Sequence, residues 1–424
     1  MRTHAWGKRI NGRRRFAVGP RLLASALAAV TVPIGAPAGA QSQLTVILTG
    51  QSMIRSDLRT SAPAAFERMQ PLLQGGDVIF TNLEGTIAEP GESAEEGRGF
   101  LTPPQALDAL QALGFNLLAF ADNHAFDLKA LGIANTLAEA HRRGIVHAGT
   151  GTNLAEAAAP AYLHLPQLTV ALVASASGLI TPGGNATAAG PGVNELRIRA
   201  GGQTNGATSD LAESSANTPD PEDAKRILAS IRAARRQADL VIVYQHNHVF
   251  GNHSFATIFS EGMAERLAPN EWLRSWTHAE VDAGADVVVM HGAPLLHGVE
   301  MYHGRPIFYD LGNFIYNLPP TITYIDEPMA WESVVARLEY RGKALRAITL
   351  SPIVLNAIGE GQPDMHDPHA NNEFLDTRGL PSVAAGAKAR YILERLAALS
   401  APFATSIEIT GETARISLGN KPQP

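Results

Sequence analysis

Four apolar residues run directly into four polar ones in Val241-Ile242-Val243-Tyr244-Gln245-His246-Asn247-His248. The pattern predicts a buried strand over 239–244 with functional side chains at its C-terminal end. Three other predicted strands have the same arrangement, and they are followed by Thr81-Asn82-Leu83-Glu84-Gly85, by Ala121-Asp122-Asn123-His124, and by His291-Gly292-Ala293-Pro294 with His297 close behind. Because the carboxyl ends of strands in an open α/β sheet meet at one ligand-binding crevice, we expect these side chains to lie in one pocket.

Strand and helix patterns alternate along the rest of the chain, which indicates an α/β fold with substantial strand pairing in one sheet. Apolar runs predict strands at 44–48, 77–83, 116–121, 145–148, 239–244 and 286–290, and hairpins over 300–309 and 332–350. Helical spacing with suitable start and stop residues predicts helices at 65–73, 103–113, 130–143, 272–283 and 382–399, and another that starts at Asp220-Pro221-Glu222-Asp223. Two short strands are expected at the C-terminus.

Composition limits the chemistry that this chain can perform. Of its 424 residues 45% are hydrophobic, which suffices for a large core, and none is cysteine. The absence of cysteine excludes disulfides, thiolate metal sites and a cysteine nucleophile. No Gly-x-Ser-x-Gly motif is present, so a serine hydrolase has no support either. Any bound metal must therefore be held by nitrogen and oxygen ligands.

The first 40 residues predict an export signal. They contain seven basic residues and no acidic one, followed by an apolar run over 22–34 and by Ala38-Gly39-Ala40, a typical cleavage site. Arg13-Arg14-Arg15-Phe16 resembles a twin-arginine signal, and an ordinary Sec signal is the alternative. We therefore expect an exported protein of the periplasm or cell envelope, with residues 1–40 removed.

Removal of this segment would leave an acidic protein. The whole chain has 34 basic and 40 acidic residues, and without the seven basic residues of the signal the net charge falls from −6 to −13. Such a balance argues against nucleic acid as a partner. No later segment is long and apolar enough for a transmembrane span. Residues 183–219 are rich in Gly, Ala, Asn, Thr and Ser, and we expect them to form a mobile insertion.

Histidines gather in the region of the predicted site. Seven of the 14 lie between His246 and His303. Imidazole, carboxylate and amide oxygens suit a divalent ion such as manganese, iron or zinc, and a carboxylate such as Glu84 can bridge two ions. The carbonyl of Asn123 can bind a hard cation while its amide contacts an anionic substrate.

Several of these residues also have plainer interpretations. His253, His278 and His303 are expected to be exposed to solvent, and His297 could pack in the core or cap an element instead of binding metal. Asn82 and Asn123 could be turn residues. Asp122 and Asp127 could orient their neighbours or cap the next helix.

Taken together in this order and spacing, these stretches resemble the CapA family of capsule synthesis, a branch of the calcineurin-like metallophosphatases. The resemblance runs from about Leu44 to Tyr316. It rests on Asn82-Leu83-Glu84, Asn123-His124 followed by Asp127, His246, His291-Gly292, Gly298-Val299-Glu300 and Ile307-Phe308-Tyr309-Asp310-Leu311-Gly312-Asn313-Phe314.

The resemblance implies a four-layer α/β/β/α sandwich around a site for one or two divalent metal ions. Residues 41–356 would form this domain, and residues 357–424 a C-terminal extension that packs on it. The implied metal ligands are Glu84, Asn123, His246 and His291, with His297 or His248 as substitutes. His124 and Asn123 would be catalytic, and Gln51, Asn82, His248 and Asn313 would contact substrate.

Two positions depart from the family pattern. The first strand of family members usually ends in Gly-Asp, where this chain has Gly50-Gln51, and a second histidine of the last motif is replaced by Ala293-Pro294. Two functions therefore stay open. One is a metal-dependent, phosphoesterase-like hydrolase in capsule or poly-γ-glutamate synthesis and export, with an anionic polymer or phosphoester as substrate and a membrane-bound polymer synthetase as partner. The other is a non-catalytic envelope protein that binds polymer or partners in the same cleft.

Overall fold

The first large sheet combines strands from the N-terminal and the C-terminal parts of the chain. The computed structural model describes residues 43–94, 99–166, 168–199, 217–249, 268–318, 328–360 and 376–418. The strands of this sheet follow the order β22-β23-β20-β19-β1-β3-β6-β7, and β21 pairs with β20. Their bounds are β1 Gln43–Leu48, β3 Val78–Asn82, β6 Leu117–Ala119, β7 Val146–Ala148, β19 Glu332–Arg341, β20 Ala344–Leu355, β21 Pro381–Val383, β22 Ile407–Thr410 and β23 Thr413–Ile416. Strands β1, β3, β6 and β7 are parallel, so their carboxyl ends share one edge.

A second sheet has the order β16-β17-β15-β14-β10-β9. Its strands are β9 Ala161–His164, β10 Thr169–Ser177, β14 Leu240–Asn247, β15 Val287–His291, β16 Val299–Tyr302 and β17 Arg305–Phe308. The central strands β10, β14 and β15 are parallel and almost wholly buried, as their continuous apolar sequences require. Four two-stranded pairs complete the strands: β2 Gln51–Met53 with β18 Asn313–Tyr316, β4 Thr86–Ile87 with β5 Leu101–Thr102, β8 Thr150–Gly151 with β11 Gly192–Val193, and β12 Ile198–Arg199 with β13 Thr218–Pro219.

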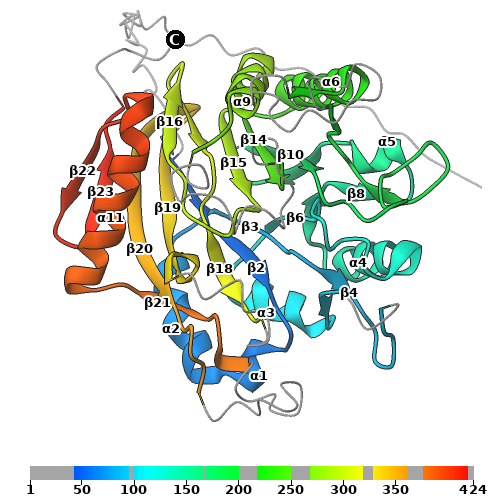
Figure 1. Ribbon diagram of the computed structural model, residues 1–424, viewed down its shortest axis with the longest axis horizontal. Helices are drawn as coiled ribbons and strands as arrows, with labels where there is room; N and C mark the ends of the chain where they lie inside the picture. Colours follow the sequence, from blue (N-terminus) through cyan, green and yellow to red (C-terminus); the bar gives the residue numbers. More distant parts are fainter. Residues whose placement is uncertain are drawn as a thin grey trace, which may run out of the picture. The chain divides into compact units, whose positions relative to one another are not determined.

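Helices pack against both sheets (Figure 1). Their bounds are α1 Leu58–Ser61, α2 Pro63–Leu73, α3 Gln105–Ala112, α4 Lys129–Arg142, α5 Leu154–Ala157, α6 Pro221–Gln237, α9 Glu271–Ala283 and α11 Gly386–Ser400, with short 3-10 turns η4 Pro328–Trp331 and η5 Ala401–Phe403. Helix α6 begins as the sequence predicts, because the Asp220 side chain accepts hydrogen bonds from the backbone nitrogens of Glu222 and Asp223.

Three hydrophobic clusters show that the domain is a four-layer α/β/β/α sandwich. The largest lies between the sheets, where residues such as Phe80 of β3 meet Tyr244 of β14. A second packs α2 and α3 against the other face of the first sheet, through residues such as Ile79. The third packs α6 and α9 against the outer face of the second sheet, through residues such as Val243. Alternate residues of one strand therefore face different clusters.

The described residues belong to one compact unit, Gln41–Pro424. The C-terminal strands β21 and β23 both pair with β20, so the expected extension contributes strands to the first sheet. The predicted signal peptide, residues 1–40, lies outside the described residues. Of the predicted insertion at 183–219, residues 183–199 and 217–219 are described, and Val193, Asn194, Leu196 and Asn217 among them are buried. The expectation of mobility stays a prediction for residues 200–216, which the structure does not describe.

Candidate metal site at the strand ends

The four polar strand ends lie in two sheets that face each other, and several of their side chains meet. Strands β14 and β15 are in register, so that His246 and His291 are direct neighbours across the second sheet. Glu84 follows β3 of the first sheet, and its backbone nitrogen donates to the Ser52 carbonyl. Asn123 follows β6 of the same sheet, and its side chain reaches His246 and His248. The predicted convergence of these residues is thus present.

Three ligand-type atoms form a close triangle at this point. His246 Nε2 lies 2.9 Å from His248 Nε2, and the two nitrogens lie 2.9 Å and 3.0 Å from Asn123 Oδ1. At most two of these three contacts can be hydrogen bonds. Two imidazole N–H groups that both donate to the Asn123 oxygen would leave two donors facing each other, and a flipped amide that donates to both rings would leave two lone pairs facing each other.

A cation among these atoms would satisfy all three at once. Ligands held at about 2.1 Å that subtend a right angle lie about 3.0 Å apart, which is close to each side of the triangle. Within the described part of the chain, the histidine and carboxylate ligand atoms that gather within 4.8 Å of one another belong to Glu84, His246 and His248. The residues present therefore fit a divalent metal with nitrogen and oxygen ligands.

Glu84 supplies the carboxylate of this group. It is 4% exposed, its Oε1 lies 3.7 Å from His246 Nε2, and its Oε2 is buried without a hydrogen-bond partner. Burial raises its pKa to about 7, partly offset by the nearby His124. An unpartnered carboxylate oxygen in a buried site is costly unless a cation or donor meets it, which again favours a metal.

The buried imidazoles are neutral, as metal ligands must be. Burial lowers the pKa of His246 well below its ordinary value, and the neighbouring His248, His291 and His124 lower it further. Burial likewise lowers the pKa of His248 to about 3, with a smaller contribution from His124. Neutral rings keep a lone pair for coordination.

Hydrogen bonds to Tyr244 and to the Thr49 carbonyl determine which ring nitrogen of His246 and of His291 can bind a metal. The Tyr244 hydroxyl lies 2.9 Å from His246 Nδ1 and can accept a hydrogen bond from Nδ1–H, which leaves Nε2 as the ligand atom. His291 Nε2 lies 3.0 Å from the Thr49 carbonyl and must donate to it, so Nδ1 carries the lone pair, and this atom is buried without a partner. Burial holds the pKa of His291 at about 3 against the opposing effect of that carbonyl. A ligand histidine that donates its other N–H to a carbonyl is the usual arrangement in metal sites.

His124 is the charged histidine of the site. Its Nδ1 donates to Asp127 Oδ2 at 2.7 Å, and its Nε2 lies 4.0 Å from Glu84 Oε1. Burial alone would lower its pKa, but Asp127, Glu84 and Asp122 outweigh burial and raise it to about 9. Asp127 also accepts from the Phe100 backbone nitrogen, and no side chain caps the first turn of α4. The aspartate therefore orients His124 and does not cap the helix.

A cavity of about 170 Å³ opens beside these residues. Glu84, His124, His248 and Gln51 are among the side chains that line it. The predicted substrate contact Gln51 is therefore at the cavity wall, with a buried carbonyl oxygen that has no hydrogen-bond partner. A group bound here would lie next to both the histidine triangle and the His124 imidazolium.

Other predicted site residues lie behind this wall. Asn313 pairs with Gln51 across β18 and β2, is fully buried, and donates to the Ala330 carbonyl. Asn82 is fully buried and donates to the Ala119 carbonyl and to Asp122. Burial, then the charge of Glu84, raises the pKa of Asp122 well above its ordinary value. These two asparagines are supports of the site, and their predicted substrate contact stays untested.

The metal roles predicted for His291 and His297 also stay predictions. Both are buried, but neither belongs to the close group of Glu84, His246 and His248. The backbone nitrogen of His297 donates to the Asp310 carbonyl. Asp57, a carboxylate that follows Gln51 by six residues, caps α1 and pairs with Arg59, so it does not take the place of the family's aspartate at Gln51.

Two expectations about histidines need correction or refinement. His278 was expected to be exposed, but its side chain is 24% exposed, stacks on Tyr302 with ring centroids 3.7 Å apart, and lies 3.1 Å from Glu300. His248 was expected to contact substrate, and the structure adds its Nε2 to the ligand-type triangle. The signal for His248 was present in the sequence, because residues two apart on a strand point to the same side. His303 is exposed as expected, and His253 lies outside the described residues.

Comparison with known proteins places this site in a family. The family model described as bacterial capsule synthesis protein PGA_cap matches residues 45–318, which span β1 to β18 and contain every residue of the site. The uncharacterized protein y4sH of Sinorhizobium fredii is 28% identical, over 88% of this chain and 93% of its own length. The PGA biosynthesis protein CapA of Bacillus subtilis is 25% identical, over 64% of this chain and 61% of its own.

Among solved structures, a phosphatase from Mycoplasma pneumoniae covers 74% of this chain and 94% of its own, with 10% identity and a TM-score of 0.41.

Proposed function

Because this chain belongs to the bacterial capsule synthesis protein family, we propose that it is a metal-dependent hydrolase of capsule or poly-γ-glutamate synthesis and export. The observation that carries the proposal is the triangle of His246 Nε2, His248 Nε2 and Asn123 Oδ1 beside the unpartnered Glu84 carboxylate. Hydrogen bonds alone cannot satisfy that arrangement, and a manganese, iron or zinc ion can.

A divalent metal in such a site acidifies water and polarises a phosphoryl or carbonyl oxygen. The residues of the chain divide the remaining work. Tyr244 holds His246 with Nε2 toward the site. His124, held charged by Asp127, lines the cavity and can stabilise negative charge or give a proton to a leaving group. Hydrolysis of a phosphoester and hydrolysis of an acyl bond can both use this combination of a Lewis-acidic metal and a proton donor.

The test is turnover by metal-loaded protein on a chromogenic phosphodiester and on γ-linked glutamate oligomers. His124→Gln should reduce the rate by about 10²- to 10⁴-fold, the usual contribution of a general acid, and leave the metal content unchanged. His303→Gln, at an exposed position, is the matched control and should change neither the rate nor the metal content. Equal rates for His124→Gln and wild type on every substrate that turns over would refute the role of His124.

One observation favours a second candidate, a non-catalytic polymer-binding protein. Gln51 lines the cavity with a neutral carbonyl where family members usually place an aspartate, so the site has one negative charge fewer. In that case the protein would bind γ-linked glutamate oligomers without turning them over. Equilibrium dialysis with labelled oligomers, run beside the rate assay, separates the two functions.

Export is part of the proposal. No helix in the described part of the chain is long and apolar enough to cross a membrane. The basic start, short apolar run and Ala38-Gly39-Ala40 support a cleaved signal peptide, through the twin-arginine or the Sec route. The partner proposed on the family resemblance is a membrane-bound polymer synthetase. N-terminal sequencing of the envelope fraction should begin at Gln41, and an intact Met1 on protein from the cytoplasm would contradict export.

A further inference from the structure

An arginine without a carboxylate partner among the described residues lines the cavity of the candidate site. Arg55 follows β2, and its side chain faces the same space as Glu84, His124 and His248. Its Nε donates to the Asn317 carbonyl at 2.8 Å, and its guanidinium lies 4.6 Å from the centroid of the Phe100 ring. These two contacts fix the plane of the guanidinium and leave the two terminal amino groups for a ligand.

Several other partly buried arginines of the described chain pair with an acidic side chain, and Arg55 does not pair with any described one. Arg143, Arg226 and Arg235 each form an ion pair with an aspartate. No described carboxylate lies within ion-pair distance of Arg55, and burial is the one influence on its pKa, which it lowers. A half-buried guanidinium that keeps its charge without an acid is costly unless an anion from outside meets it.

Guanidinium chemistry indicates which anion. The planar fork of donors matches carboxylate or phosphate oxygens in pairs, and a point-charge ammonium does not. The cavity volume of about 170 Å³ is below the roughly 300–1,000 Å³ of pockets that hold whole small ligands. It therefore has room for one end group of a larger molecule.

We propose that Arg55 binds an oxyanion of the substrate, a carboxylate or a phosphate, and so makes this a site for anionic chains. The inference deepens the proposed function and rests on it only for the reaction, since anion binding at Arg55 does not itself require turnover.

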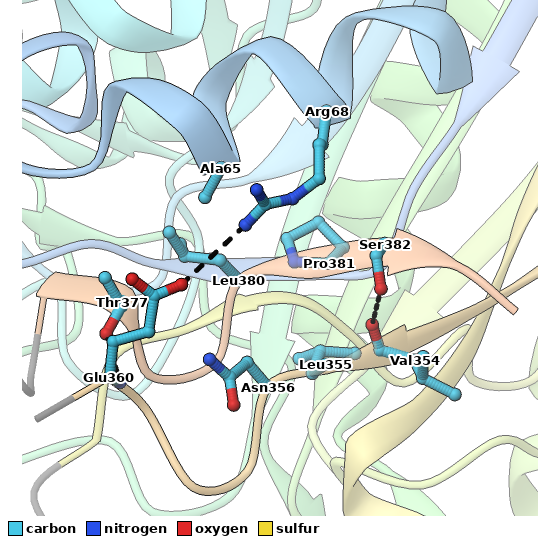
Figure 2. A pocket seen from close by; sticks show the side chains of 10 residues that line it. All are labelled: Ala65, Arg68, Val354, Leu355, Asn356, Glu360, Thr377, Leu380, Pro381 and Ser382. Carbon is cyan, nitrogen blue, oxygen red and sulfur yellow. Dashed lines mark hydrogen bonds and ion pairs between the residues drawn. The ribbon is translucent and has the colours of Figure 1, made fainter.

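A second cavity supplies the matched control. Figure 2 shows Arg68 of α2 reaching across that cavity toward Glu360, and the two charged groups lie 3.9 Å apart. Arg68 thus lines a cavity but already forms an ion pair with a carboxylate. It predicts no anion site there, and its loss should not change anion binding at Arg55.

The experiment is isothermal titration of the full chain with inorganic phosphate and, separately, with γ-glutamylglutamate. Each titration is run on metal-loaded and on metal-stripped protein, and metal content and melting temperature are measured on the same samples. Arg55→Gln should weaken binding about tenfold or more, the usual worth of a charge-assisted hydrogen bond, and Arg55→Lys should recover part of it. Arg68→Gln should bind like wild type. The ligand that binds more tightly identifies phosphate or carboxylate as the natural group.

Equal affinity of wild type, Arg55→Gln and Arg55→Lys for both probes would overturn the inference, whatever the metal content. If the wild type takes up no metal and Arg55→Gln still binds the anions more weakly than wild type, the proposed metal-dependent hydrolysis is refuted and the anion site is supported. If Arg55→Gln fails to fold, Arg55→Lys decides, because it keeps the charge and removes the planar fork.

Discussion

Gly292 holds the two histidine-bearing strands at a distance that no other residue allows. It follows His291 with a φ of 124°, a backbone conformation that side chains disfavour. A Cβ atom at this position would lie 2.2 Å from the Asn247 carbonyl oxygen, where contacts below 3.0 Å essentially never occur. Gly292→Ala must therefore move the two segments apart by about 0.8 Å, the difference between 2.2 Å and 3.0 Å.

That displacement is large compared with what a metal site tolerates. Asn247 lies between His246 and His248, and metal–ligand distances hold within about 0.2 Å. We expect Gly292→Ala to weaken metal binding by about 10- to 100-fold, as comparable disturbances around ligands do. Backbone strain of about 1–3 kcal/mol and overpacking of a further 1–3 kcal/mol should also lower the free energy of unfolding.

Gly91→Ala separates strain from crowding. Gly91 has a φ of 91°, and a Cβ atom there would meet nothing within 4 Å. This variant should lose only the strain energy and keep its metal. Urea unfolding and metal titration of both variants provide the measurement. If Gly292→Ala matches Gly91→Ala in both, the close approach to Asn247 does not shape the site and the reasoning is wrong.

Two further predictions concern a hydroxyl and a carboxylate. Tyr244→Phe removes the hydrogen-bond partner of His246 Nδ1 and should weaken metal binding about 10- to 100-fold. Tyr340→Phe is the control, because it removes a buried hydroxyl that has no hydrogen-bond partner among the described residues and should leave metal binding unchanged. Metal titration of the two variants provides the measurement. The pKa of Glu139 is lowered to about 2, chiefly by hydrogen bonds from Arg142 and Arg143, so its stabilising effect is complete above the ordinary value of 4.5 and is lost as the pH falls through about 2. Urea unfolding should therefore show Glu139→Gln less stable than wild type at pH 7 with the gap closing toward pH 2, and a gap independent of pH would contradict the assigned ion pairs.

Much of the fold could be predicted because its strands are runs of apolar residues. Strands β1, β3, β6, β14 and β15 lie where such runs were found, and both predicted hairpins are present as β16–β17 and β19–β20. Strand β10, Thr169–Ser177, was not predicted, although it is the buried neighbour of β14. Its apolar run from Val170 to Ala174 was a usable signal of the same kind. The strand pattern alone predicted one sheet whose strand ends meet in one crevice. The structure has two large sheets, and only the family resemblance implied a second one.

The site residues that directly follow a predicted strand could be identified from the sequence. Glu84, Asn123 and His246 were expected together and are together. The inclusion of His248 depends on β14 continuing through Asn247, beyond its apolar run, and strand ends are set by pairing with β10 and β15. His278 was misjudged because its partner Glu300 comes from β16, and a contact between segments this far apart in sequence leaves no local pattern.

Metal content tests the central claim most directly. Full-length protein purified without chelators, and the variants His246→Ala, His248→Ala and His303→Ala, would be analysed by inductively coupled plasma mass spectrometry. Wild type and His303→Ala should carry one or two divalent ions per chain, and the other two variants should lose most of theirs, because each removes one corner of the triangle. Equal metal content in all four proteins, or wild type that holds no metal after loading with manganese, iron or zinc, would contradict the account.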